Sequence, residues 1–209
     1  MQRLILASGS PRRKELLARI GVPFDVMVSG IDESLGDHDH AETFALAMSR
    51  EKARDIAARL QGEGLHAGCL VLAADTVVAR EGHILGKPVD RADAERMLRL
   101  LSGSWHDVIT GMTLLRADTG EAQSAAETTR VKFRELDETL IRRYLETDEP
   151  SDKAGAYAVQ GFGAVLVERI VGDYYNVMGL PIQRLSGMLE EFGTEPLSWL
   201  DSREPEQGI

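Results

Sequence analysis

The chain has 209 residues, of which 43% are hydrophobic and 28% are charged, and its formal net charge is −10. This composition is typical of a globular protein that buries enough apolar surface to fold without a disulfide or cofactor staple. The acidic balance argues against a general surface for nucleic acids or membranes, so cations that serve a function must be concentrated locally.

Strand-like and helix-like segments alternate along the chain, which favours an α/β architecture. In chain order we expect a strand RLILA at 3–7, a helix at 11–20, a strand FDVMVSG at 24–30, a helix at 41–60, a strand CLVLAADTVVAR at 69–80 that turns into HILG at 83–86, a helix at 91–103, a hairpin of 105–117 with 121–136, a helix at 137–147, a strand AVLVERIVG at 164–172 and a helix at 180–193. Ser10 and Asp90 stand at helix starts as caps, and Gly21 and Gly103 stand where two helices should stop.

No internal repeat or low-complexity linker divides these segments. We therefore expect one two-lobed domain over residues 1–193. A polar tail should follow at 194–209, because this stretch holds two prolines, several acids and no hydrophobic periodicity.

The only cysteine, Cys69, lies in the apolar central strand, which favours a packed thiol in a reducing compartment over a nucleophile. The apolar stretch at the start is too short for a signal peptide, and no later run approaches the roughly 18 apolar residues of a membrane span. Together these features predict a cytoplasmic protein.

The stretch LASGSPRRKELL at 6–17 joins the first strand to the first helix and carries two hydroxyls, a glycine and three consecutive cations. Backbone N–H groups at a helix start are unpaired and partly positive, so the turn Ser8-Gly9-Ser10 can cradle a phosphate. Arg12 and Arg13 would add charge-assisted bonds, and cations in a first helical turn are disfavoured unless something negative sits there. The alternative is a well-capped helix with solvated arginines.

Asp75 interrupts the apolar central strand LVLAADTVV. A buried ionised carboxylate costs several kcal/mol unless it is paired, hydrogen-bonded or bound to a metal, and a divalent cation is the natural partner. The alternative is that the strand ends at Ala74 and that Asp75 begins a loop. The apolar pair Val77-Val78 continues the run and therefore favours a functional aspartate.

Two lysines are further candidates. Lys52 falls on one helical row with Phe44, Met48 and Ile56, so a cation occupies an apolar face of the helix. The alternative is that the lysine stem covers apolar surface while its ammonium reaches the solvent at the helix edge. Lys87 lies in the tight turn GKP, from which its ammonium could reach a phosphate. A solvated turn lysine is the more common situation.

The segment SDKAGAYAVQGFG at 151–163 concentrates small residues around Lys153, Tyr157 and Gln160. Its glycines permit close backbone approach to a ligand, and Gln160 offers a donor and an acceptor suited to the edge of a nucleobase. A glycine-rich surface loop is the alternative. GDHDH at 36–40 does not count as a metal motif here, since histidines among acids in a loop are more often solvated.

These segments together resemble the Maf family of nucleoside triphosphate pyrophosphatases over about residues 4–192. The matching segments are LASGSPRRKELL, EKA, AADTVV, GKPVDRADAERMLRLLSG, HDVITG, EPSDKAGAYAVQGFG and YNVMGLP. The resemblance implies an elongated mixed α/β fold, similar to the inosine triphosphate pyrophosphatases, with flanking helices and a cleft between two lobes. It also implies hydrolysis of a nucleoside triphosphate between the α and β phosphorus atoms, with help from a divalent cation, Mg²⁺ or Mn²⁺.

Roles for single residues follow from the same resemblance. Asp75 would be the general base or the metal-linked activator of water, and Glu33 in GIDES would help to hold the metal. The implied phosphate contacts are Ser8, Gly9, Ser10, Arg13, Lys52 and Lys87. Arg12, Thr76 and Gln160 would set the choice of base.

Family members with arginine directly after SP, threonine after the strand aspartate and YxxQG in the late loop resemble the dTTP/UTP branch, and this chain has all three features. The branch that acts on 7-methyl-GTP resembles SPWRR, SDQV and SEG, none of which occurs here. The resemblance thus favours hydrolysis of dTTP and UTP in nucleotide-pool house-cleaning. The alternatives are 7-methyl-GTP hydrolysis and a nucleotide-binding regulator of septum formation. The expected partner is the nucleotide, without nucleic acid or membrane, and a homodimer is implied by the resemblance alone.

Overall fold

The structure is a computed structural model that describes residues 3–32, 40–194 and 197. Its strands are β1 (Arg3–Leu6), β2 (Phe24–Val26), β3 (Cys69–Arg80), β4 (His83–Leu85), β5 (Trp105–Arg116), β6 (Ala122–Phe133) and β7 (Val167–Val171). Its α-helices are α1 (Pro11–Arg19), α2 (Ala41–Gly62), α3 (Arg91–Leu101), α4 (Glu138–Tyr144), α5 (Tyr174–Met178) and α6 (Ile182–Glu191). Three 3₁₀ turns follow α4, namely η1 (Glu149–Asp152), η2 (Ala154–Ala156) and η3 (Phe162–Leu166).

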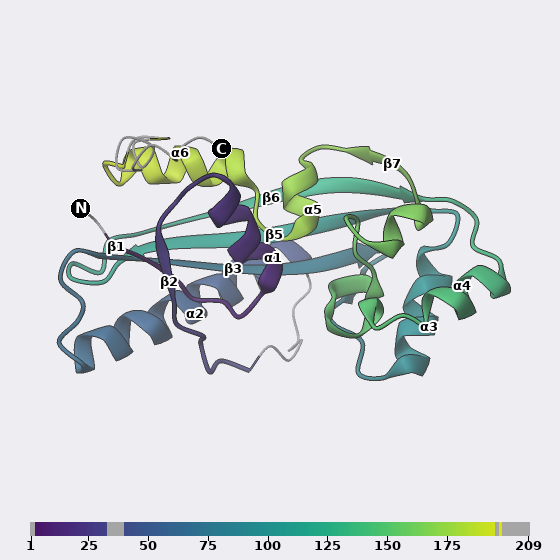
Figure 1. The fold of residues 1–209 in the computed structure, drawn as a ribbon, viewed down its shortest axis with the longest axis horizontal. Helices are drawn as coiled ribbons and strands as arrows, with labels where there is room; N and C mark the ends of the chain where they lie inside the picture. Colours follow the sequence, from purple (N-terminus) through teal and green to yellow (C-terminus); the bar gives the residue numbers. More distant parts are fainter. Residues whose placement is uncertain (1–2, 33–39, 195–196, 198–209) are drawn as a thin grey trace, which may run out of the picture.

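One mixed sheet joins all seven strands in the order β2-β1-β3-β5-β6-β7, with β4 paired to β3. β1 is parallel to β2 and β3, whereas the β3-β5-β6-β7 pairs are antiparallel. Figure 1 shows β3, β5 and β6 running along the long axis of the molecule. The register sets Asp75 opposite Gly111 and Thr76 opposite Thr110, near the middle of the long strands. The expected elongated mixed α/β fold is therefore confirmed.

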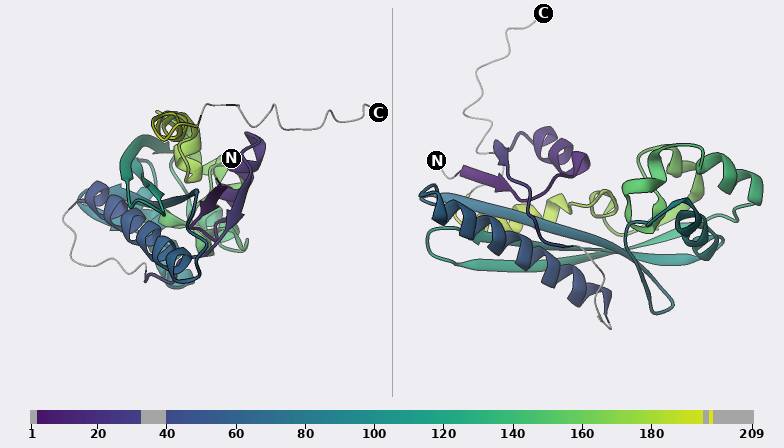
Figure 2. Two further views of the ribbon diagram at one scale, coloured as in Figure 1. Left: turned by 90° about the vertical axis from the view of Figure 1, so that its left-hand side faces the viewer. Right: turned by 90° about the horizontal axis from the view of Figure 1, so that it is seen from below.

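β3 is buried on both faces because its alternate residues enter different hydrophobic clusters. Leu70 and Leu72 belong to the largest cluster, and Val71 and Ala73 belong to a second cluster that includes residues of α2. This alternation is the period of two that an extended chain imposes. Figure 2 shows α2 lying along one face of the long strands. The helix comes so close to β5 that a Cβ at Gly111 would lie 2.4 Å from the backbone of the helix.

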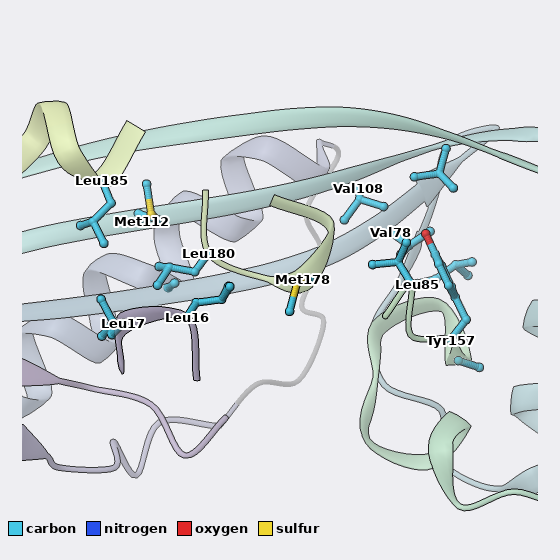
Figure 3. Packing of buried hydrophobic residues seen from close by; sticks show 14 of the residues in the cluster. Leu16, Leu17, Val78, Leu85, Val108, Met112, Tyr157, Met178, Leu180 and Leu185 are labelled. Carbon is cyan, nitrogen blue, oxygen red and sulfur yellow. The ribbon is translucent and has the colours of Figure 1, made fainter. Parts of the chain in front are cut away.

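The largest cluster extends along the other face of the sheet and connects the two ends of the molecule. Figure 3 shows part of it, with Leu16 and Leu17 of α1 in one region and Tyr157 with Val78 and Leu85 in another. In Figure 1, α1, α2 and α6 accompany one end of the sheet, and α3, α4 and the 3₁₀ turns accompany the other. The same cluster therefore contacts α1 and α6 at one end of the sheet and α3 and α4 at the other, whereas α2 packs against separate clusters.

Most of the expected elements are present, and the differences have local causes. The helix α5 was missed, although Asp173 caps it by accepting hydrogen bonds from two backbone N–H groups and Gly179 ends it in a left-handed conformation. Both residues are ordinary helix boundary signals. Residues 164–166, expected as the start of a strand, belong to η3, where the backbone turns so that Phe162 and Gly163 donate to the Glu149 carboxylate. Ser10 occupies the N-cap position of α1 without a capping side-chain bond.

Within the residues described, no helix is both long enough and apolar enough to cross a membrane. The division into a domain at 1–193 and a tail at 194–209 stays a prediction, because almost all of the expected tail lies outside the described residues. The GDHDH segment lies outside them too, apart from His40.

Candidate active site

A cleft of about 670 Å³ opens between the first turn of α1, the middle of β3, the turn at 86–89, the end of α5 and the segment 152–160. Among its lining residues are nine that the sequence pointed to, namely Ser8, Gly9, Ser10, Arg12, Arg13, Asp75, Thr76, Lys87 and Gln160. Lys52 is not on its lining, but it binds one of the residues that are. Glu33 lies outside the described residues. The structure thus brings together nearly all of the predicted site.

The turn before α1 is organised around the hydroxyl of Ser8. The Ser8 Oγ accepts hydrogen bonds from the Ser10 backbone N–H at 3.2 Å and from Arg13 Nη1 at 3.0 Å. A hydroxyl has one proton to donate and two lone pairs. Both bonds use lone pairs and neither uses the Ser8 proton. Because Ser8 lines the cleft, its hydroxyl suits a phosphate oxygen as a donor.

Arg13 ties three separate parts of the chain together. Besides Ser8, its guanidinium donates to the backbone oxygen of Gly179 at 2.8 Å and to Thr76 Oγ1 at 3.0 Å. These bonds connect α1 with the end of α5 and with β3, using the rigid planar fork that distinguishes arginine from lysine. Arg13 therefore fixes the geometry of the cleft, and the phosphate contact expected of it stays a prediction.

Asp75 and Lys52 form a buried ion pair. Lys52 Nζ lies 2.6 Å from Asp75 Oδ1, and the two residues are only 5% and 7% exposed. Phe44, Met48 and Ile56, which share the helical row of Lys52, are buried as well, so the apolar face inferred for α2 is confirmed. The partner of Asp75 that the sequence required is thus a lysine from α2. The expected phosphate contact of Lys52 stays a prediction.

A line of hydroxyl groups crosses the sheet beside Asp75. Thr76 Oγ1 lies 2.9 Å from Thr110 Oγ1, which in turn donates to the backbone oxygen of Asn176 at 3.2 Å. The Thr110 proton is used in that bond, so Thr76 must donate its own proton to Thr110 while it accepts from Arg13. Thr76 therefore lines the cleft with a hydroxyl that the protein already holds, and its part in base choice stays a prediction.

Thr110 and Asn176 were not picked out from the sequence as site residues. Both are fully buried, and Asn176 Nδ2 donates to the Val108 carbonyl at 2.9 Å and to Thr129 Oγ1 at 3.0 Å. The signal that would have found Asn176 is its place in YNVMGLP, one of the segments on which the family resemblance rests. A threonine inside a strand gives no such signal, because it is a common residue in sheets.

The glycines of the segment 151–163 are required by protein contacts. A Cβ at Gly155 would lie 2.8 Å from Val78, and this glycine has φ of 68°. A Cβ at Gly161 would lie 1.8 Å from a carboxylate oxygen of Glu149, and one at Gly163 would lie 2.6 Å from the Ala158 carbonyl. The sequence interpretation assigned these glycines to ligand approach, whereas the structure shows that they let the segment fold tightly on itself and on β3.

Charged groups face the cleft from both sides. Burial lowers the pKa of Arg12, and the charges of Asp152 and Glu149 partly offset this effect. Partial burial raises the pKa of Asp152, but the hydrogen bond and charge of Lys153, followed by the charge of Arg12, outweigh it and leave the pKa below its ordinary value. Arg12 thus comes from the α1 side and interacts electrostatically with acids of η1.

The turn that carries Lys87 is attached to the same segment. The Gly155 backbone N–H donates to the Gly86 carbonyl at 3.1 Å, directly before Lys87. Lys87 itself is exposed and lines the cleft. The turn and the late segment are therefore placed relative to each other by a backbone bond, which keeps a lysine at the mouth of the cleft.

His106 supports the cleft from behind. Its Nε2 lies 2.9 Å from the hydroxyl of Tyr157, a lining residue, and its ring packs edge-on against Phe133 and Tyr157. Burial, followed by the charge of Arg80, lowers the pKa of His106 to about 3. The imidazole is therefore neutral over the whole physiological range.

This burial makes stability depend on pH. The unfolded His106 binds a proton near pH 6.5, whereas the folded form does so only near pH 3. The histidine thus contributes stability above pH 6.5 that is lost as the pH falls. Glutamine does not titrate, and we expect His106→Gln to have a lower free energy of unfolding than the wild type at pH 6.5. The difference in unfolding free energy between the two proteins should be about 2 kcal/mol smaller at pH 4.5. Urea unfolding at both pH values measures this difference, and a constant difference would contradict the burial of a neutral imidazole.

The described part of the chain contains no cluster of three or more histidine, cysteine or acidic residues that could enclose a metal ion. A hard cation such as Mg²⁺ commonly binds one or two carboxylates together with substrate phosphates, so a full protein cage is not needed. Asp75 fits this arrangement, because a carboxylate has several lone pairs and Lys52 occupies one side of it. The donor set therefore suits an ion held jointly by protein and substrate.

Comparisons with known proteins show the family of the chain. The model of the Maf-like protein family matches residues 3–192. The dTTP/UTP pyrophosphatase of Acetivibrio thermocellus is 47% identical over 198 residues, which cover 94% of this chain and 98% of that protein. The dTTP/UTP pyrophosphatase of Symbiobacterium thermophilum is 48% identical over 193 residues, which cover 92% and 95%. Among solved structures, the Ham1 protein of Staphylococcus aureus is similar with a TM-score of 0.46 and 17% identity, over 91% of this chain and 100% of that one.

Proposed function

Since the chain belongs to the Maf family, we propose that it is a nucleoside triphosphate pyrophosphatase, which hydrolyses dTTP and UTP to the monophosphate and pyrophosphate. The observation that carries this proposal is that the Ser8 turn, Asp75 and Lys87 line one and the same cleft. The names of the relatives support the choice of pyrimidine nucleotides. House-cleaning of the nucleotide pool is the role that fits such a reaction.

Charge neutralisation is the first requirement of the reaction. A triphosphate carries about four negative charges near neutral pH, so water cannot attack before donors and cations balance them. Ser8, the first turn of α1 and Lys87 line the cleft, and their hydroxyl, N–H and ammonium groups would supply this balance. Arg13 holds Ser8 and Thr76 in place, so the donors need little rearrangement when the substrate binds.

Asp75 would orient the attacking water. An isolated carboxylate with a pKa near 4 is a weak proton acceptor, so orientation is a better role for it than strong basicity. Its bond to Lys52 restrains one of the two carboxylate oxygens. Asp75, together with Glu33, would hold Mg²⁺ or Mn²⁺, which when bound supplies positive charge and lowers the pKa of a water.

Base choice would depend on the segment around Gln160 and on Arg12. The side-chain amide of Gln160 has an N–H donor and a carbonyl acceptor. The Watson–Crick edge of thymine or uracil presents a carbonyl acceptor beside an N–H donor, so the two groups can pair. Arg12 and Gln160 line the same cleft as Ser8 and Lys87, so the base and the phosphates would share one continuous binding site.

A product assay tests the proposal. Purified protein is incubated with Mg²⁺ or Mn²⁺ and, in turn, dTTP, UTP, CTP, GTP and 7-methyl-GTP. We expect monophosphate and pyrophosphate from dTTP and UTP, with kcat/KM at least about tenfold above that for the purine nucleotides. Nucleoside diphosphate with orthophosphate would contradict the cleavage site. Preference for 7-methyl-GTP, or binding without turnover, would instead favour the methylated nucleotide or a regulatory role. Cytoplasmic location and a homodimer stay predictions.

A further inference from the structure

Glu149 is the first residue of the matching segment EPSDKAGAYAVQGFG, although the sequence assigned it no role. It is the centre of a hydrogen-bond cluster at the base of the loop 158–163. Its Oε1 accepts from the Tyr144 hydroxyl at 2.8 Å and from the Gly163 backbone N–H at 2.7 Å, and its Oε2 accepts from the Phe162 backbone N–H at 2.8 Å. Bonds from neutral donors to a charged acceptor are stronger than ordinary hydrogen bonds. One carboxylate thus holds the backbone just after Gln160.

The other side of Gln160 is held through the same cluster. The Tyr144 hydroxyl, which donates to Glu149, also accepts a bond from the Ala158 backbone N–H at 3.3 Å. Glu149 and Tyr144 therefore fix the chain two residues before Gln160 and two or three residues after it. The residues between these anchors form a short loop whose tip carries the glutamine.

The sequence of the loop is adapted to this carboxylate. A Cβ at Gly161 would lie 1.8 Å from Glu149 Oε2, and a Cβ at Gly163 would lie 3.0 Å from the Tyr144 hydroxyl and 2.6 Å from the Ala158 carbonyl. Larger residues at these positions would push the carboxylate or the tyrosine out of place. The two glycines are therefore needed because the Glu149 carboxylate and the Tyr144 hydroxyl pack against them. A glutamate whose side chain pointed into solvent would place no such restriction on these positions.

The cluster also touches the cleft. Glu149 begins η1, and Asp152 at the end of η1 lines the cleft together with Lys153, Ala158 and Gln160. Moving the carboxylate would therefore shift both the glutamine and the charged pair that faces Arg12. The charge of Glu149 acts on Arg12 as well, since it is among the causes that oppose the lowering of the Arg12 pKa.

We propose that Glu149 is a positioning residue for base selection: through Phe162, Gly163 and Tyr144 it holds the loop that presents Gln160 to the nucleobase. The inference rests on the proposed function and deepens it. Glu149 does not line the cleft, so it would not contact the phosphates or the reacting atoms. Its loss should consequently weaken recognition of the base and leave the phosphate side of the cleft unchanged.

Glu149→Gln tests the proposal, because glutamine keeps the size of the side chain but replaces one acceptor oxygen with a donor that opposes a backbone N–H. We expect KM for dTTP and UTP to rise about tenfold or more, with kcat changed by less than about threefold. The inhibition constant of pyrophosphate, a probe of the phosphate side alone, should stay within about twofold of the wild-type value. Glu146→Gln, a change of the same kind at a nearby exposed residue, is the control and should alter neither quantity.

A double-mutant cycle separates positioning from a general structural role. If Glu149 acts through Gln160, adding Glu149→Gln to Gln160→Ala should raise KM by less than about twofold further. Additive effects, an equal loss for dTTP and pyrophosphate, or an unchanged KM would each overturn the inference. Should Glu149→Gln fail to fold, Tyr144→Phe removes one arm of the cluster and should raise KM for dTTP in the same direction. Wild-type protein without activity on any triphosphate would instead overturn the proposed function, and this inference with it.

Discussion

Asp75→Asn is expected to lower turnover at saturating nucleotide and metal by about a thousandfold, because it removes the charge that orients water and attracts a cation. Asparagine has nearly the same shape and retains an oxygen that can accept from Lys52, which lies 2.6 Å from the carboxylate. The fold should survive at a cost in stability, because the buried Lys52 keeps a hydrogen-bond acceptor but loses its counter-charge. The loss should appear in kcat, measured as pyrophosphate release from dTTP with Mg²⁺ or Mn²⁺.

The matched control is Asp107→Asn. Asp107 lies on β5, which is adjacent to β3, but its side chain is about half exposed and it does not line the cleft. This variant should retain wild-type turnover. Near-normal kcat for Asp75→Asn under the same conditions would remove Asp75 from the reaction and with it the central carboxylate of the proposed mechanism.

Lys52→Met is expected to have the largest effect on stability. It leaves the Asp75 carboxylate buried without its ammonium partner, and loss of one member of a buried ion pair typically costs about 3–5 kcal/mol. The free energy of unfolding, from urea titration at neutral pH, measures this loss. Lys14→Met is the control, because it makes the same exchange of lysine for methionine at a half-buried position of α1. It should change the free energy of unfolding by less than about 1 kcal/mol.

A second substitution distinguishes the ion pair from simple packing. In the double variant Lys52→Met with Asp75→Leu, neither charge of the pair remains to be buried. Most of the stability lost in Lys52→Met should therefore return, but turnover should be absent because the Asp75 carboxylate is gone. If Lys52→Met alone were harmless, or if the double variant were less stable than the single one, the pair would not be the energetic unit that its burial indicates.

The sequence predicted the elements because hydrophobic period and helix boundaries are local properties. The apolar row of Phe44, Met48 and Ile56 showed which face of α2 would be buried, and the run around Asp75 showed a carboxylate inside a strand. The short α5 was missed because only five residues are helical, which is too few for a periodic pattern. Its capping aspartate and final glycine were the signals available.

For the site, the sequence supplied the residue types, and the resemblance to a family supplied their grouping. It could not supply the partners. The bond between Arg13 and the Gly179 carbonyl joins positions 166 apart, and the pair of Lys52 with Asp75 joins positions 23 apart. Glu149 lies in the matching segment EPSDKAGAYAVQGFG, but nothing local gave it a role, since an acid beside a proline in a polar segment is typical of any surface turn.

By itself, the sequence determined that this chain forms alternating strands and helices, that a lysine and an aspartate stand among apolar residues, and that a turn of hydroxyls and cations begins the first helix. Only the tertiary structure decided that this lysine and this aspartate neutralise each other, that Arg13 joins three segments, and that the late glycines make room for Glu149. The physical reason is that burial is encoded by the periodicity of each segment, whereas the choice of polar partner is made only when the sheet register and helix packing bring distant segments within hydrogen-bond distance.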